Sequence, residues 1–366
     1  MKISSTLSLY IGKNFLFAFI AFFAGLLSLI FLLEIMELLR RAASKPDVTN
    51  GLMLEMALLK LPHMGMLLFP FSVLFAGMAS FWKLSRSSEL AITRAAGISA
   101  WQFLVPVIFI AFLLGILKIT ALNPISSTTL GRFQQLEAIN FKGQKSFLAI
   151  SDGGLWLRQG DDKGQAVIHA DSILQQADSA TVYAVTVYLY GIDNSFIGRI
   201  DAPEAMLKNG FWLLPRAWVS EGEKPSYMVE EYKLSSDLTL TKIQDNFAPP
   251  ETMSFWDLPG FIKTLDKAGF SAIRHRLHWH SLLSTPLLLC AMVLIAATFT
   301  LRHARKGTTY FIIGSGVMTG FLLYFITDVV FALGLSESIP VVLAAWAPSG
   351  IATMLGVAML FHLEDG

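Results

Sequence analysis

The stretch Phe15-Leu-Phe-Ala-Phe-Ile-Ala-Phe-Phe-Ala-Gly-Leu-Leu-Ser-Leu-Ile-Phe-Leu-Leu33 contains no charged residue. An α-helix rises about 1.5 Å per residue, so a run of this length can cross a hydrocarbon core about 30 Å thick. Backbone amides and carbonyls find no water there and must pair within the segment, which favours a helix. The stretch therefore predicts a membrane-spanning helix.

Five more apolar runs can span a membrane, and their spacing divides the chain. We predict them at residues 64–82, 101–122, 281–301, 310–333 and 339–361. Three spans therefore precede a long polar insert, predicted at 124–268, and three follow it. The expected fold is an α-helical membrane protein with six transmembrane helices, built from residues 1–123 and 269–366, that carries one inserted domain.

The composition narrows the classes of function. Hydrophobic residues make up 54% of the chain and charged residues only 15%, against about 25% charged in typical soluble domains. The net charge of +1 gives no case for nucleic acid as a partner. Cys290 is the only cysteine, which excludes internal disulfides and Cys-based metal sites, and we interpret it as a small buried hydrophobe. No enzyme motif is evident, and the spans contain no Ser/His or paired-carboxylate arrangement, so we expect no catalytic residues and no cofactor. No Gly-x-x-x-x-Gly-Lys-Ser/Thr loop occurs, so any ATP would be hydrolysed by a partner.

Lysines and arginines in the short loops predict the orientation, because they accumulate on the cytoplasmic side of a membrane. The basic residues on one side are Lys2, Lys13, Lys83, Arg86, Arg94, Arg302, Arg305 and Lys306. Those in the short loops of the other side are Arg40, Arg41 and Lys45. We therefore expect both termini in the cytoplasm and the insert on the other side of the membrane, which is the periplasm if the cell is a Gram-negative bacterium.

The insert changes from helical to strand periodicity between residues 147 and 245. Segments such as Gly154-Leu-Trp-Leu-Arg158 are short, rich in β-branched and aromatic residues, and bounded by turn residues. This pattern is typical of an antiparallel sandwich, jelly roll or open barrel. We expect an all-β, jellyroll-like periplasmic domain with a packed core. Before the fourth span, segment 255–265 places apolar residues on one helix face, for the membrane interface or for docking on the membrane body.

Arg40 and Arg41 close the first span on the side where basic residues are disfavoured. One interpretation is structural, because Glu37 can pair with Arg41 on its own helix and the side chains can extend to the interface. The other is functional, because forked guanidinium groups suit an anionic headgroup. Arg132, soon after the third span, and Arg274 and Arg276, soon before the fourth, would lie near the same level. Each alone is more often a surface charge, whereas together with Arg40 and Arg41 they would form an anion-binding rim.

Several residues inside the spans are unusual for lipid-facing helices. A charge there costs about 3 kcal/mol, so Lys118 and Asp328 are expected to face protein or water. A local partner near a span end is the favoured interpretation for Lys118, whereas for Asp328 that option and a place on a substrate path stay open. In the fifth span, Gly314, Gly316 and Gly320 permit close helix approach, either within the chain or to a second subunit.

The cytoplasmic loop at residues 85–97 carries signals for a short helix. Its serines can cap the first turn, and its final glycine can end the helix. A short capped helix between two spans can press into a groove on a soluble partner, although periodicity alone favours a plain connecting helix. Candidate contact residues are Ser88, Glu89, Leu90, Arg94 and Gly97.

Short motifs occur in a fixed order along the chain. They are Tyr10-Ile-Gly-Lys13, Leu38-Leu-Arg-Arg41, Leu61-Pro62, Phe69-Pro70, Ser88-Glu-Leu-Ala-Ile-Thr-Arg-Ala-Ala-Gly97, Gly154-Leu-Trp156 and Ala344-Ala-Trp-Ala-Pro348. In this order, and in a frame of three spans, a β domain and three spans, they resemble the LptF/LptG permease family, the membrane subunits of the lipopolysaccharide exporter. The resemblance covers nearly the whole chain. The end of the first span and the Gly-Leu-Trp motif are more similar to the LptG branch than to the LptF branch.

The resemblance implies a non-catalytic permease subunit of an ABC exporter that moves lipopolysaccharide out of the inner membrane. The implied partners are an LptF-like paralogue, a dimer of an LptB-like ATPase, an LptC-like single-span protein and the periplasmic bridge. The helix with Glu89 would insert into the ATPase, and Arg40 and Arg41 would contact phosphates. The first and fifth spans would form a lateral gate, with the fifth-span glycines and Asp328 on it, and the β-jellyroll would receive lipid. Glu34 departs from the family pattern, where another basic residue is frequent, and implies a different headgroup charge.

Other functions stay open on the sequence alone. One is an LptF-type paralogue of the same exporter. Another is a scaffold or signalling protein whose β domain binds a periplasmic peptide by strand addition. A third is a proton-coupled carrier that uses Lys118 and Asp328, which internal inverted repeats would favour; none is evident in the sequence.

Overall fold

The computed structural model describes residues 5–42, 49–95, 97–142, 147–151, 154–161, 164–176, 179–191, 195–208, 210–222, 225–236, 248–267, 270–300 and 309–365. Contacts between residues divide the chain into two compact units. The helical unit comprises Met1–Leu136 and Leu277–Gly366, and the β unit comprises Glu137–Arg276. Each unit has its own hydrophobic core.

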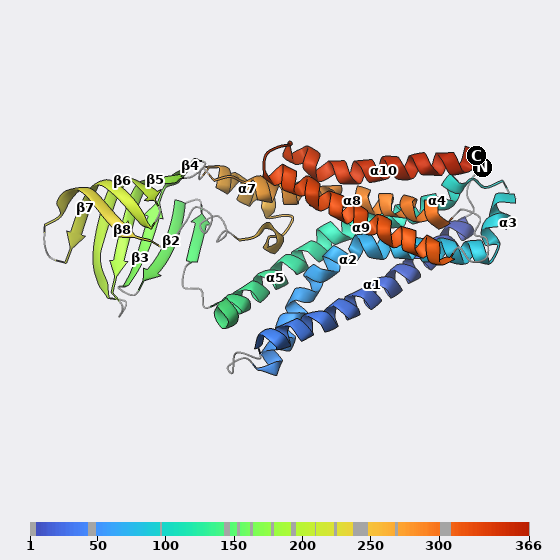
Figure 1. Cartoon of the computed structure of the whole chain (residues 1–366), viewed down its shortest axis with the longest axis horizontal. Coiled ribbons are helices and arrows are strands. Elements are labelled where there is room, and N and C mark those ends of the chain that lie inside the picture. The colour runs from blue at the N-terminus through green and yellow to red at the C-terminus, as the bar shows by residue number, and fades with distance from the viewer. Residues whose placement is uncertain are drawn as a thin grey trace. The chain divides into compact units, whose positions relative to one another are not determined.

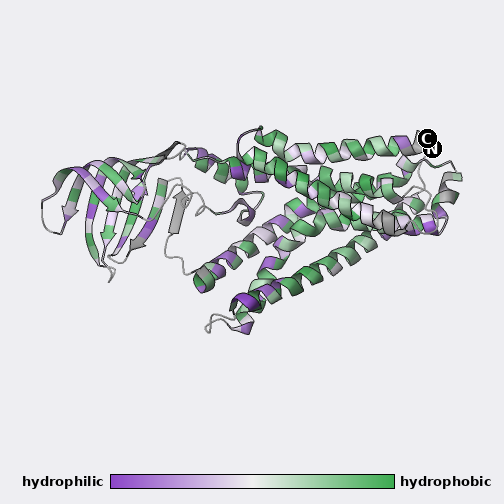
Figure 2. Ribbon diagram, viewed as in Figure 1, coloured by the Kyte–Doolittle hydropathy of each residue, from purple (hydrophilic) through white to green (hydrophobic). Residues whose placement is uncertain are grey.

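The helical unit contains the helices that can cross a membrane, and hydrophobic residues line them along their length (Figure 1, Figure 2). Length and hydropathy identify six candidate spans among the described residues, which confirms the predicted number. A seven-residue helix, α3, lies between α2 and α4. The helices are α1 (Ser5–Ala42), α2 (Asn50–Arg86), α3 (Glu89–Ala95), α4 (Ala100–Leu117), α8 (Ile273–Thr300), α9 (Thr309–Leu335) and α10 (Val341–Asp365).

The helical backbone of the third span continues well beyond α4. It passes through the π-helical turn η1 (Lys118–Leu122), α5 (Asn123–Glu137) and a second π-helical turn, η2 (Ala138–Lys142). The Asn123 N–H donates to the Lys118 carbonyl oxygen, so this turn is wider than an α-helical one. A proline ring clashes with the carbonyl four residues earlier in a regular helix, and the wide turn gives the ring of Pro124 room. The helix thus runs past the residue where we predicted the insert to begin, and the domain limits of 124 and 268 stay a prediction.

The centre of the helical unit is α8. In its most apolar window 78% of the residues are buried, against 6% for α1 and 17% for α9. Small residues allow neighbouring backbones to approach it closely: a Cβ on Gly77 of α2 would lie 2.8 Å from the Cβ of Ala296. A Cβ on Gly115 of α4 would lie 2.5 Å from the Cα of Pro286. Such contacts hold helices together in lipid, where burial of apolar area gives little net gain.

The β unit is built on one antiparallel sheet of eight strands (Figure 1). The strand order is β1-β2-β3-β5-β6-β7-β8, and β4 pairs with the first half of the long strand β5. The predicted antiparallel β structure is confirmed. The strands are β1 (Phe147–Ser151), β2 (Gly154–Asp161), β3 (Gly164–Ala170), β4 (Ser172–Gln176), β5 (Ser179–Tyr190), β6 (Phe196–Lys208), β7 (Phe211–Glu221) and β8 (Tyr227–Ser235).

The core of the β unit lies on one face of this sheet. Along β6, buried and more exposed residues alternate over much of the strand, as expected for side chains that point to opposite faces. Trp212 of β7 is only 1% exposed within this core. After a short 3-10 turn, η3 (Pro250–Thr252), the helix α7 (Leu258–Lys267) packs Leu265, Phe261 and Ile262 onto the same cluster. The apolar helix face that we predicted at the membrane interface or on the membrane body therefore covers the sheet core.

We expect Gly115→Ala to lower the thermal unfolding midpoint of the detergent-solubilised protein. The added Cβ would press on the backbone of Pro286, which cannot rotate away as a side chain can. Overpacking of this kind costs about 1–3 kcal/mol. Gly25→Ala is the matched control, because nothing lies within 4 Å of a Cβ at Gly25. Equal midpoints for the two variants would contradict the close α4–α8 contact.

Candidate functional site

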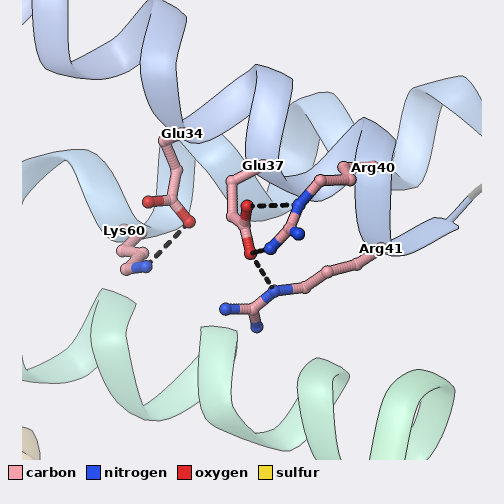
Figure 3. A network of polar contacts seen from close by, with 5 residues as sticks. All are labelled: Glu34, Glu37, Arg40, Arg41 and Lys60. Atoms are coloured by element: carbon pink, nitrogen blue, oxygen red, sulfur yellow. Dashed lines mark hydrogen bonds and ion pairs between the residues drawn. The ribbon is translucent and has the colours of Figure 1, made fainter.

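A cluster of charged side chains joins the end of α1 to α2 (Figure 3). Glu37 accepts hydrogen bonds from Nε and Nη2 of Arg40, both at 2.9 Å, and from Nε of Arg41 at 2.8 Å. Because the arginines follow Glu37 by three and four residues, all three side chains emerge on one face of the helix. The predicted Glu37–Arg41 pair is present, and Glu37 holds both arginines.

A second ion pair in the cluster links two helices. Lys60 of α2 donates to Glu34 Oε1 of α1 at 2.7 Å, and these side chains are only 21% and 12% exposed (Figure 3). The Lys60 ammonium also lies 5.2 Å from the ring centroid of Phe133 in α5. Lys60 therefore contacts α1 and α5 from α2. Arg132, next to Phe133 in α5, is exposed and forms no ion pair with the residues that the structure describes.

Lys60 is the functional candidate that sequence reasoning missed. Helices α1 and α2 form an antiparallel hairpin, in which residues at equal distances from the connection lie at the same height. Residues 34 and 60 are both 13 positions from residue 47, in the connection between the helices. This symmetry could have paired Glu34 with Lys60 once the hairpin was recognised.

Helix α3 lies inside the predicted 85–97 segment. Ser88 has a φ of +60°, and its carbonyl oxygen accepts the N–H of Ile92 to start the helix. Ser87 Oγ donates to the Glu89 carboxylate at 2.8 Å. Beyond the helix, Gly97 has a φ of +80°, and the next residue closes the end with a bond to the Thr93 carbonyl oxygen. The local sequence thus fixes both ends of α3.

The two sides of α3 differ in what they contact. Leu90 is 7% exposed and belongs to the core of the helical unit. Ile92 is 68% exposed. A cavity of about 180 Å³ lies beside the helix, and its lining includes Glu89, Ile92 and Tyr10 of α1. Leu90 therefore anchors α3, while Glu89 and Ile92 face the cavity; the side chain of Arg94 lies outside the described residues.

The glycines of α9 contact α2 of the same chain. A Cβ on Gly320 would lie 3.0 Å from Leu74 Cδ2, and a Cβ on Gly316 would collide with the end of the Met78 side chain. A Cβ on Gly314 would meet nothing within 4 Å. Two of the three predicted packing glycines thus have an intramolecular neighbour. A role at a gate stays a prediction.

Much of the rest of α9 is exposed on the helical unit. Phe325 is 65% exposed and Met318 is 68% exposed. Asp328 is exposed on the same helix. It is energetically unfavourable for a carboxylate to face lipid. We therefore expect this side of α9 to contact protein or water near Asp328.

Lys118 lies in the interior of the helical unit. The residue is 8% exposed, and its ammonium is 6.0 Å from the ring centroid of Phe69 in α2. Phe69 in turn packs against Phe19 and Phe23 of α1, at centroid distances of 5.1 and 5.4 Å. The ammonium of Lys118 therefore contacts an aromatic ring of another helix. The sequence had favoured a partner close to Lys118 near the end of its span.

Among the described residues, no group of three or more His, Cys, Asp or Glu side chains could hold a metal ion.

Comparison with known proteins decides the family. The family model of the lipopolysaccharide export system permease LptF/LptG matches residues 9–362. The chain belongs to this family.

Individual relatives support the LptG branch. The lipopolysaccharide export system permease protein LptG of Escherichia coli (strain K12) is 22% identical over 373 residues, which cover 99% of each chain. The protein of the same name from Haemophilus influenzae is 22% identical over 375 residues, which cover 98% of each chain. The similarity therefore extends through both units of this LptF/LptG family member.

We expect Lys118→Met to raise the thermal midpoint of this LptF/LptG permease and Lys60→Met to lower it. Methionine removes the desolvation cost of a buried ammonium at residue 118. At residue 60 the same change leaves the 12% exposed Glu34 carboxylate without its cation, a loss of about 1–3 kcal/mol or more. Differential scanning fluorimetry compares the two variants. An equal fall for both would mean that Lys118 has a stabilising anionic partner.

Proposed function

We propose that the chain is a non-catalytic transmembrane subunit of an ABC exporter, of the LptG type. It extracts lipopolysaccharide from the inner membrane and passes it to a periplasmic bridge toward the outer membrane. The observation that carries this proposal is the family match over residues 9–362, which includes all six candidate spans in whole or in large part. The LptG names of the relatives favour this type over an LptF-type paralogue.

The energy for transport would enter through α3. Leu90 fixes this helix to the core of the helical unit, so a force on the exposed Ile92 and on Glu89 is transmitted to α2 and α4. We propose that an LptB-like ATPase dimer holds these two residues and hydrolyses the ATP. Ser88 and Gly97 would set the ends of the coupling helix, and Arg94 would add a positive charge to the contact.

The proposed orientation places α3 and both termini in the cytoplasm. An even number of spans puts the two termini on one side, and the loop basic residues favour the cytoplasm for that side. The β unit then lies in the periplasm, where we propose that it acts as a jellyroll-like domain. It would receive the lipid and contact an LptC-like protein and the bridge.

Two helices offer apolar surface for the lipid and for a second permease. Few residues in the apolar windows of α1 and α9 are buried. Lipopolysaccharide is too large for the interior of six packed helices, and we propose that an LptF-like paralogue completes the cavity. Gly314, Gly316, Gly320 and Asp328 would lie on the gate formed by α9 with α1.

The anionic headgroup would bind at the outer end of α1. Arg40 and Arg41 project from the helix there, and guanidinium groups bind phosphate through paired hydrogen bonds. Arg132 of α5 would add a third basic group. The acyl chains would contact the exposed apolar side chains of α1.

We expect Glu89→Lys to abolish ATP-driven lipid release from proteoliposomes that contain this chain, its paralogue and the ATPase. The charge reversal would repel the ATPase from α3 while the spans still insert. Glu55→Lys makes the same change at an exposed position near the other end of α2 and should keep the wild-type rate. Lipid release by Glu89→Lys at the wild-type rate would contradict coupling through α3.

A further inference from the structure

The sheet of the β unit carries an open cavity over three of its inner strands, β5, β6 and β7. The cavity has a volume of about 310 Å³, and its lining includes Thr186, Asp201, Pro203 and Trp218. Asp201 and Trp218 lie opposite each other in the pairing of β6 with β7. The residues on either side of each along its strand are buried in the core, so these two side chains point to the other face of the sheet. Trp218 is 50% exposed there, beside a carboxylate.

The Asp201 carboxylate is held in place through one of its two oxygens. Oδ1 accepts hydrogen bonds from Thr186 Oγ1 at 2.9 Å and from Nε and Nη2 of Arg199 at 2.9 and 2.7 Å. Oδ2 accepts no hydrogen bond from the residues that the structure describes, and the side chain is 38% exposed. Asp201 therefore offers a fixed, charged acceptor to a hydroxyl group in the cavity.

The backbone beside the cavity is strained at two positions. Ala184 of β5 and Arg216 of β7 each have a φ of +54°, and no other non-glycine residue in the described part of the β unit has a positive φ. The strand pairings place one on each side of Pro203 in β6. Proline cannot donate to the ladder, and left-handed residues with a side chain cluster at ligand sites. The strain of the β unit is thus concentrated at this cavity, whose lining includes Ala184 and Pro203.

The row of side chains through Asp201 continues across the sheet. Strand pairing sets Thr186 opposite Asp201 and His169 opposite Thr186. The next residue in the row is Trp156, which is 40% exposed and has its ring centroid 4.3 Å from that of His169. Neighbouring strands are about 4.8 Å apart, so Trp156 and Trp218 are about 19 Å apart at the two ends of this row. An elongated ligand can contact an indole at each end and polar groups between them.

The chemistry of the row selects among ligand classes. The three strands are already paired on both sides, so a peptide cannot add to them as a further strand. An acyl chain would cover the Asp201 carboxylate without giving it a donor, which is unfavourable. A phosphate would be repelled by the free carboxylate oxygen. A neutral sugar fits, because its hydroxyls donate to a carboxylate and its C–H face packs on an indole ring.

We propose that this face of the sheet binds the sugar chain of the transported lipid. One sugar ring stacks on Trp218 and donates a hydroxyl hydrogen bond to Oδ2 of Asp201, and the chain continues along the row toward Trp156. The proposal rests on the lipid-export function proposed above and assigns a site to the saccharide part of its substrate. The hydrophilic part of the lipid is then held on the side of the sheet away from the apolar core.

The experiment measures binding of the oligosaccharide that mild acid releases from lipopolysaccharide to the full-length chain in nanodiscs, by isothermal titration calorimetry. Trp218→Ala should weaken binding by about tenfold or more, because the sugar ring loses the apolar surface that it covers. Trp218→Phe keeps an aromatic ring and should bind within about threefold of the wild type. Trp256→Ala is the matched control, because Trp256 is a 62% exposed tryptophan of the β unit outside the cavity. It should bind like the wild type.

Asp201→Asn tests the hydrogen-bonding part of the site. Asparagine has nearly the same shape but no charge, so binding should weaken by about tenfold. This variant also keeps the test decisive if Trp218→Ala fails to fold. Equal affinity of the wild type, Trp218→Ala and Asp201→Asn would show that the sugar binds elsewhere and would overturn the proposal.

Competition identifies the source of the sugar. Neither an equimolar cell-wall glycan fragment nor an unstructured peptide should displace the oligosaccharide. Displacement by the glycan fragment would contradict the assignment to the transported lipid, and displacement by the peptide would indicate a peptide site instead.

Lipid release from proteoliposomes separates this proposal from the proposed function. A wild-type chain that supports ATP-driven lipid release but does not bind the oligosaccharide would contradict the sugar site alone. A wild-type chain that supports no release with its paralogue and the ATPase would contradict the transport function, and the assignment of the sugar to a transported lipid would fall with it.

Discussion

Water is absent from the hydrocarbon layer, and this constraint governs both the packing and the chemistry of the helical unit. Apolar side chains gain little by moving from lipid to protein, so helix association depends on close contact between small residues. Gly77 against Ala296 and Gly115 against Pro286 are contacts of this kind. They place α8 at the centre and leave large parts of α1 and α9 exposed. The unit is therefore well packed inside while its outermost helices still offer apolar surface.

The same constraint gives weight to the few charged side chains near the spans. Buried Lys118 contacts the ring of Phe69, and the Glu34–Lys60 pair connects α1 to α2. Each charge that is removed from water must be compensated locally, which fixes the helices that carry it. At the C-terminal end of α1 the compensation is uneven, because Glu37 and its arginines are partly or largely exposed whereas Glu34 and Lys60 are mostly buried. Because of this difference, the buried ion pair holds α1 and α2 together, while the exposed arginines can exchange their partner.

Local sequence signals were sufficient to predict the helices and strands but not the contacts between them. The six spans, the antiparallel strands and the position of α3 could be predicted because each depends on periodicity or capping within a short window. The continuous helix past Pro124 could not, since it depends on the π-helical turn that makes room for the ring. The contact of Gly320 with Leu74 could not be predicted either. The spacing of glycines shows that another helix can approach closely, but it does not show which helix does so. The face of α7 was recognised, but its partner, the sheet core, required the tertiary structure.

The central claim is that this LptF/LptG family member works only as one part of an ATP-driven assembly. Native mass spectrometry of the chain, purified from its own membrane in mild detergent, tests it most directly. The account predicts a complex with one copy of this chain, one paralogue and two copies of a P-loop ATPase. A chain that is isolated alone, or with a soluble partner that binds no ATP, would contradict it.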